Sequence, residues 1–148
     1  MTFQAAIESE GLQGRYTIYQ ATGLKALEVR ADELRGIVPA LRSAAEEAKS
    51  EVKQALAALG TRATEVYVEV DFEATNKEGR DAEFQIALKA DSIAEGLNKE
   101  VGDREGRQRD ADAELELASR EWTIVLERIR NRRAFVNLLA GGNTGGTE

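Results

Sequence analysis

Residues 24–59 read LKALEVRADELRGIVPALRSAAEEAKSEVKQALAAL, and apolar residues recur in this segment in alternating steps of three and four. An α-helix places such a series along one stripe, and an average step of about 3.5 residues is typical of a helix packed lengthwise against another helix. All eleven positions of this seam are apolar: Leu24, Leu27, Ala31, Leu34, Val38, Leu41, Ala45, Ala48, Val52, Ala55 and Leu59. The segment therefore predicts a first long helix over residues 24–60, with Gly60 as its C-terminal stop.

Pro39 lies inside this predicted helix, three residues after Gly36. Proline lacks the amide hydrogen that the helix ladder uses and clashes with the preceding turn, which costs about 3 kcal/mol. The seam nevertheless keeps its phase from Leu34 to Leu41. We therefore expect a continuous helix with a kink near residues 36–39.

A second series with the same spacing runs from Ala87 to Leu139. Three of its members are polar: Arg104, Gln108 and Arg132. The series predicts a second helical region over residues 76–140, followed by a disordered tail over 141–148. Two helices with matching seams predict a long helical hairpin or coiled coil. We expect its packing seam to contain Leu24, Leu27, Leu34, Val38, Leu41, Val52, Leu59, Leu115, Trp122, Val125 and Ile129.

A β element is expected between the two helices. Residues 65–72 read EVYVEVDF, and every second side chain of this run shares one face: Val66, Val68, Val70 and Phe72. Such alternation predicts a strand within a β segment over 61–75. A lone strand leaves its backbone unpaired, so we expect a partner, either the β-prone run at 15–19 in the N-terminal segment 1–23 or the same strand of another subunit. The expected fold class is mainly α, with this small β element.

The composition excludes several classes of function. The 148 residues include neither cysteine nor histidine, so disulfides, thiol catalysis and histidine-ligated metals are excluded. No phosphate-binding glycine loop or nucleophile elbow occurs, and we expect neither an enzyme nor a cofactor. No apolar run approaches the roughly 18 residues that span a membrane, so we expect a cytoplasmic protein without membrane contact.

Charge is spread unevenly along the chain. The net charge is −7, and residues 61–103 carry eleven acidic and five basic side chains. One basic cluster stands apart and is the candidate for contact with an anion or nucleic acid: Arg128, Arg130, Arg132 and Arg133. Pairing with the negative end of a long helix and with carboxylates explains the same residues, and the acidic balance disfavours nucleic acid as the partner.

Several large apolar residues lie just off the two seams: Leu56, Ile93, Leu117 and Leu126. A single hairpin would leave these side chains exposed to water. Self-association would cover them, so we expect a dimer or a higher oligomer.

Two short segments resemble small helical proteins encoded by bacteriophages. They are EATNKEGRDA at residues 73–82, which contains a T-N-x-x-x-R pattern, and RIRNRRAFVNLLA at 128–140. The helix–strand–helix plan is also similar to Gam-type host-nuclease inhibitors, which bind DNA ends as dimers, and to prefoldin-like chaperone subunits. The resemblance implies a phage-encoded protein that works in the host cytoplasm, and it transfers no functional residues to this chain.

These observations predict a non-enzymatic, oligomeric coiled-coil protein. We expect it to act through contacts with an unidentified protein partner, as an accessory or inhibitory factor. Two alternatives stay open: a DNA-binding protein like the host-nuclease inhibitors, and a prefoldin-like holdase chaperone.

Overall fold

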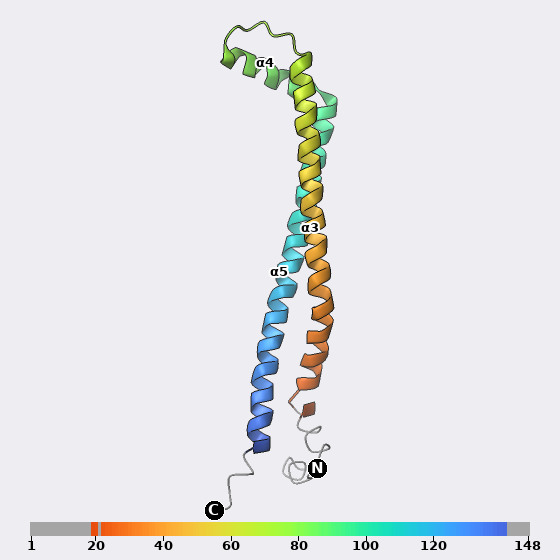
Figure 1. The fold of residues 1–148 in the computed structure, drawn as a ribbon, viewed down its shortest axis with the longest axis vertical. Helices are drawn as coiled ribbons and strands as arrows, with labels where there is room; N and C mark the ends of the chain where they lie inside the picture. The colour runs from red at the N-terminus through yellow and green to blue at the C-terminus, as the bar shows by residue number, and fades with distance from the viewer. Residues whose placement is uncertain (1–18, 21, 142–148) are drawn as a thin grey trace, which may run out of the picture. The chain divides into compact units, whose positions relative to one another are not determined.

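The computed structural model describes residues 19–20 and 22–141, which are mainly helical. Three helices follow one another in this part of the chain: α3 (Leu24–Glu69), α4 (Lys77–Ala90) and α5 (Ser92–Gly141), as Figure 1 shows. The predicted mainly α fold class is therefore confirmed. Residues 15–18 of the β-prone run at 15–19 and residues 142–148 of the expected tail at 141–148 lie outside the described residues.

The prediction of a β element between the helices is wrong for the described residues. Residues 65–69 form the last turns of α3, and residues 70–75 contain no strand. Valine at every second position also fits a helix here, because Val66 lies seven residues after Leu59 and continues the seam. Val66 is 5% exposed, whereas Val68 is 77% exposed, as a helix places it. The helix satisfies its own backbone hydrogen bonds, which a lone strand could not.

Helix α3 is longer than the sequence predicts because Gly60 does not end it. The helix continues through Gly36, Pro39 and Gly60, and it ends at Glu69 without a glycine cap. A glycine inside a helix costs only about 1 kcal/mol relative to alanine. The apolar seam on both sides of Gly60 supplies enough packing to outweigh that cost.

The chain divides into two compact units, and we describe each by itself. Unit 1 contains residues 1–40 and 116–148, and unit 2 contains residues 41–115. In unit 1 the first turns of α3 pack against the last turns of α5. The core of this unit is a buried cluster, with Trp122 among the half-buried side chains packed on it: Leu24, Ala31, Leu34, Val125 and Ile129.

A tight turn leads into α3 in unit 1. Gly23 has a φ of 70°, a backbone conformation that residues with a Cβ rarely adopt. The Thr22 hydroxyl donates to the carbonyl oxygen of Tyr19 at 3.0 Å. Thr22 therefore stabilises the turn before the helix.

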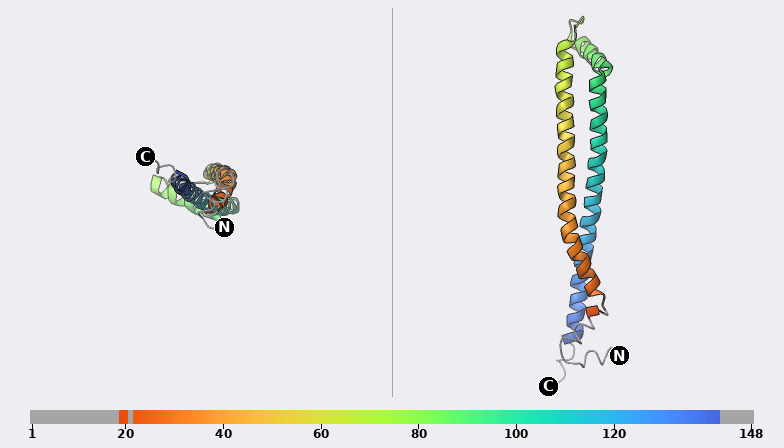
Figure 2. Two further views of the ribbon diagram at one scale, coloured as in Figure 1. Left: turned by 90° about the horizontal axis from the view of Figure 1, so that it is seen from below. Right: turned by 90° about the vertical axis from the view of Figure 1, so that its right-hand side faces the viewer.

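In unit 2 the segment of α3 after residue 40 runs beside the start of α5, as Figure 2 shows. The six residues of unit 2 that are under 9% exposed all have small side chains: Ala45, Val52, Ala55, Val66, Ala94 and Val101. Arg104 occupies a polar position of the second seam. Its Nη1 atom donates to the carbonyl oxygen of Glu51 at 2.9 Å, which explains how a charged residue is accommodated there.

Within unit 2, helix α4 lies across the C-terminal end of α3 and the N-terminal end of α5 (Figures 1 and 2). Its N-cap is Asn76, whose side chain accepts from the amide of Gly79 at 2.8 Å. Asn76 therefore satisfies one of the free amides in the first turn of α4. A side chain at position 79 would place its Cβ 2.5 Å from the Cβ of Ala74, so this close turn requires glycine.

Candidate interaction surfaces

The four arginines of the basic cluster all lie exposed on the last turns of α5, in unit 1. Arg133 donates from Nη2 to Oε1 of Glu28 on α3, at 2.9 Å. Among the described residues, the guanidinium groups of Arg128, Arg130 and Arg132 make no hydrogen bond or ion pair. Arg132 was expected in the second seam, but its side chain is exposed.

The cluster does not converge on one point. Arg128 and Arg132 are four residues apart and share one side of α5, whereas Arg130 and Arg133 are three apart and share another. Arg128 and Arg130 are two residues apart, and a helix turns such neighbours to nearly opposite sides. The structure therefore offers two arginine pairs and not a single four-cation site.

The predicted seam residues face the helix pair in their respective units. Six of them are under 9% exposed: Leu24, Leu34, Val38, Val52, Val125 and Ile129. The other five are half-buried: Leu27, Leu41, Leu59, Leu115 and Trp122. Trp122 packs against the unit 1 core, so the aromatic ring is a packing group in this structure.

An ion pair that was not predicted from the sequence joins α3 and α5 in unit 1. Arg30 donates from Nε to Oε1 of Glu121 at 2.7 Å and from a terminal nitrogen to Oε2 at 2.9 Å. Arg30 also bonds Glu33 on its own helix at 2.9 Å. The two bonds to Glu121 lower the pKa of that carboxyl, and those to Glu121 and Glu33 raise the pKa of the Arg30 guanidinium.

On the other side of unit 1, Glu28 receives two bonds. The Tyr19 hydroxyl donates to one carboxylate oxygen, and Arg133 donates to the other. The Tyr19 bond and then the Arg133 bond lower the pKa of Glu28. Glu28 therefore ties the turn before α3 and the end of α5 to the first turns of α3.

A second two-pronged ion pair fixes the corner between α4 and α5 in unit 2. Arg62 of α3 donates from Nε and Nη2 to the two carboxylate oxygens of Asp91, each at 2.8 Å. The Asp91 carboxylate also accepts from the amide of Ala94 at 2.8 Å, so it caps the N-terminus of α5. The bonds from Arg62 and then from Ala94 lower the pKa of Asp91 to about 2.

The end of unit 2 forms an exposed surface that we call the acidic tip, residues 65–90. These residues carry seven acidic and three basic side chains, a net charge of −4. The Tyr67 ring packs at a tilt against Phe72 and edge to face against Phe84, with ring centroids 5.1 and 5.3 Å apart, and so joins α3, the loop and α4. The apolar side chains of Val68 and Ile86 are left 77% and 70% exposed.

The loop of the acidic tip is held by side chains of α4. Glu83 accepts from the backbone amides of Glu73 and Ala74 at 3.1 and 3.0 Å. Arg80 donates from Nε to the carbonyl oxygen of Ala74 at 3.1 Å. These hydrogen bonds hold the loop backbone of the acidic tip against α4.

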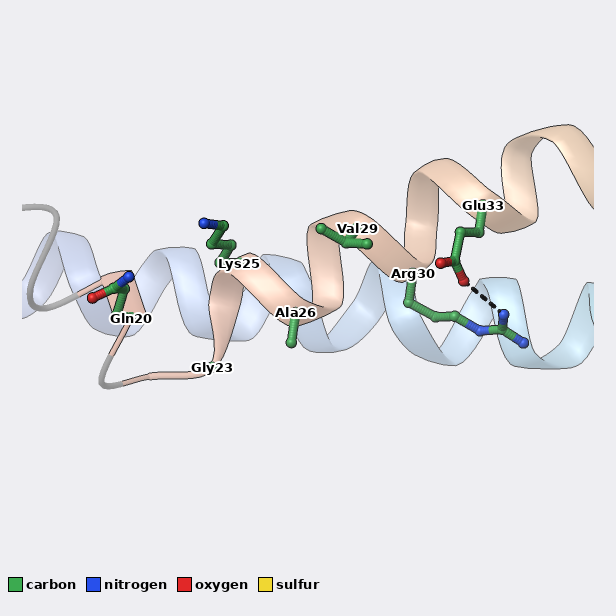
Figure 3. A pocket seen from close by; sticks show the side chains of 7 residues that line it. All are labelled: Gln20, Gly23, Lys25, Ala26, Val29, Arg30 and Glu33. Carbon is green, nitrogen blue, oxygen red and sulfur yellow. Dashed lines mark hydrogen bonds and ion pairs between the residues drawn. The ribbon is translucent and has the colours of Figure 1, made fainter.

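The turn before α3 and the first turns of that helix line a hollow of about 630 Å³ in unit 1. Figure 3 shows the side chains that line it. The labelled side chains point to different sides: Lys25 and Val29 to one, Ala26 to the other, and Arg30 toward Glu33. Such a lining suits contact with a surface better than the enclosure of a small molecule.

The part of the chain that the structure describes contains no group of three or more acidic side chains placed to hold a metal ion. Within the same residues, no helix has an apolar stretch long enough to cross a membrane. No protein-family model, curated protein or solved structure matches the chain.

Proposed function

We propose that this chain is a non-enzymatic coiled-coil protein that acts through protein–protein contacts, as a phage-encoded accessory or inhibitory factor. The proposal includes a cytoplasmic location. The observation that carries it is the acidic tip, where two large apolar side chains are exposed beside a net negative charge. Exposed apolar side chains with polar and charged residues around them are typical of sites of contact between proteins.

The chemistry of the acidic tip selects the kind of partner. Apolar anchors such as Val68 and Ile86 gain free energy when a partner protein removes them from water. The surrounding carboxylates attract a basic surface and slow the approach of an acidic one. The proposed partner is therefore a protein with a basic surface around apolar pockets, for example a protein that otherwise binds nucleic acid.

Affinity capture from an extract of the native host tests this proposal. The double variant Val68→Ser, Ile86→Ser should recover at least tenfold less of the proteins that the wild type retains, because it lacks both anchors. Retention by the wild type should also weaken as salt is raised. The matched control is Leu138→Ser in unit 1, since Leu138 is 72% exposed in the wild type. Equal recovery by the wild type and the double variant would contradict the proposal.

Nucleic acid binding is a second candidate, and one observation favours it. Arg128 and Arg132 share a side of α5 and have no carboxylate partner among the described residues, so both guanidinium groups are available to phosphates. The acidic balance of the chain limits such binding to this local pair. The holdase alternative rests on the resemblance alone and stays a prediction.

Fluorescence anisotropy with a labelled DNA duplex at a series of salt concentrations tests the second candidate. If the arginine pair contacts two phosphates, Arg128→Ala, Arg132→Ala should weaken binding and reduce the salt slope by about 2. Arg133→Ala is the matched control, because Glu28 already neutralises that arginine. Undetectable binding at low salt, or equal losses in both variants, would reject a role for this pair.

A further inference from the structure

Unit 1 carries an exposed strip of side chains on each of its two helices, and one ion pair shows that both strips lie on the same side. On α5, Leu117 and Ile124 lie four residues before and three after Glu121, so they share its stripe. On α3, Ile37 lies seven residues after Arg30 and shares the stripe of that residue. Since Arg30 bonds Glu121, the strips meet along one face.

We call this surface the Arg30–Glu121 face. Four of its large apolar side chains are substantially exposed, with Ile37 at 39%, Leu117 at 68%, Ile124 at 48% and Phe135 at 47%. The remaining members are Ala26, Arg30, Glu33, Glu121 and Arg128.

The spacing on this face indicates a helical occupant. Its α5 members follow in steps of four, three, four and seven residues, from Leu117 through Glu121, Ile124 and Arg128 to Phe135. This is the heptad spacing of a second packing seam, beside the one that α3 already covers. A second copy of unit 1 presents two helices with matching strips, and two such pairs make a four-helix bundle.

The charges on the face select one arrangement of two copies. If a two-fold axis runs along the helices, α3 of one copy lies over α5 of the other and every residue keeps its level along the axis. Arg30 and Glu121 lie at the same level, because they are bonded to each other. Arg30 therefore faces Glu121 of the partner subunit, and the four side chains alternate in sign.

The other two-fold arrangement reverses the second copy. With the axis across the helices, α3 lies over α3 and α5 over α5. Centred on the ion pair, this arrangement sets Arg30 against the partner's Arg30 and Glu121 against the partner's Glu121, which is repulsive. Apolar contact alone does not distinguish the two arrangements, but the charge pattern does.

We propose that a second copy of this chain covers the Arg30–Glu121 face, with a two-fold axis running along the helices. The arrangement places Leu117 within about one helical turn of Ile37 of the partner subunit, so apolar groups meet beside the charged network. The inference deepens the proposed function, since it names the self-association surface of a protein that acts through contacts.

A swap of the two charges tests the arrangement without breaking the ion pair within the chain. The double variant Arg30→Glu, Glu121→Arg keeps one carboxylate and one guanidinium in each copy, so it should fold and form dimers with itself. Mixed with tagged wild type, it should form few heterodimers, because like charges then face each other across the interface. Native mass spectrometry after subunit exchange should show a heterodimer fraction several-fold below the half that random exchange gives.

Other outcomes of the exchange experiment overturn the proposal. A preference for heterodimers would indicate the reversed arrangement, since Arg30 then faces glutamate at position 30. A random distribution would mean that the face lies outside the contact. Light scattering that finds a monomeric wild type would also overturn it, while leaving capture by the acidic tip, and thus the proposed function, unaffected.

A hydrophobic variant gives an independent check of the same face. Ile124→Glu should dissociate the dimer in light scattering while the helical circular dichroism is retained. The matched control is Leu126→Glu, because Leu126 is 43% exposed and lies two residues along the helix, on the far side of α5. A dimer that survives Ile124→Glu would contradict the assignment of the face.

Discussion

Replacing Leu34 by aspartate is expected to unfold unit 1. Leu34 is 1% exposed and packs in the cluster with Val125 and Ile129. The substitution removes apolar contacts and buries a carboxylate that has no partner there. We expect the free energy of unfolding to fall by about 4 kcal/mol or more, which is a large part of the stability of a typical domain.

Helical circular dichroism and urea unfolding measure this effect. The Leu34→Asp protein should lose a large part of its ellipticity at 222 nm at room temperature, or unfold at much lower urea. Leu138→Asp is the control, since Leu138 is 72% exposed on α5 of the same unit and should tolerate the charge. Equal stability of the two variants would contradict the assignment of Leu34 to the core.

The success of the helix prediction has a physical reason. Apolar residues at steps of three and four lie along one side of a helix. In a pair of helices this side is the one that is buried against the partner, so the spacing alone predicts the buried residues. The eleven seam positions from Leu24 to Leu59 are therefore buried or half-buried in their units. The polar Arg104 fits too, because its long side chain reaches a backbone carbonyl on α3.

The strand prediction failed because two periods coincide at the end of α3. Val66 and Val70 are four residues apart, which suits a helix, and Val68 between them completes an alternating pattern. Alternation alone cannot say which partner would pair with the strand. The helix needs no partner for its backbone, whereas the strand does, and this difference outweighs the β propensity of valine.

The ion pairs could not be predicted from the sequence. Arg30 and Glu121 are 91 residues apart, and charged residues make up 32% of the chain, so many pairings compete on paper. Only the register of the two helices in unit 1 selects this pair. A signal was present in the second heptad strip of Leu117, Ile124 and Phe135, which predicts that α5 has two packing sides.

The second large effect is expected at Asp91. The Asp91→Ala variant loses the N-cap of α5 and both bonds from Arg62, whose side chain is 17% exposed in the wild type. The loss of such a cap alone lowers a melting temperature by several degrees, and an arginine left without its carboxylate adds to the effect. We expect a melting temperature lower by about 5–10 °C, measured by circular dichroism.

An exposed ion pair serves as the matched control for Asp91→Ala. Asp32 pairs with Arg35 at 3.5 Å, and both side chains are more than 70% exposed. Water already solvates these two groups, so Asp32→Ala should change the melting temperature by only about a degree. Equal losses in the two variants would show that the Arg62–Asp91 pair has no special role in holding the corner.

The pH dependence of the two variants follows from the pKa of Asp91, which its bonds lower from 3.8 to about 2. A carboxyl with a lowered folded-state pKa stabilises the fold above its unfolded value, and that contribution is lost as the pH falls from about 4 to about 2. The wild type should therefore lose more stability across this range than Asp91→Ala, whereas Asp32→Ala should follow the wild type. Parallel curves for the wild type and Asp91→Ala would mean that the carboxylate is bonded neither to Arg62 nor to the Ala94 amide in solution, because those bonds couple its protonation to folding.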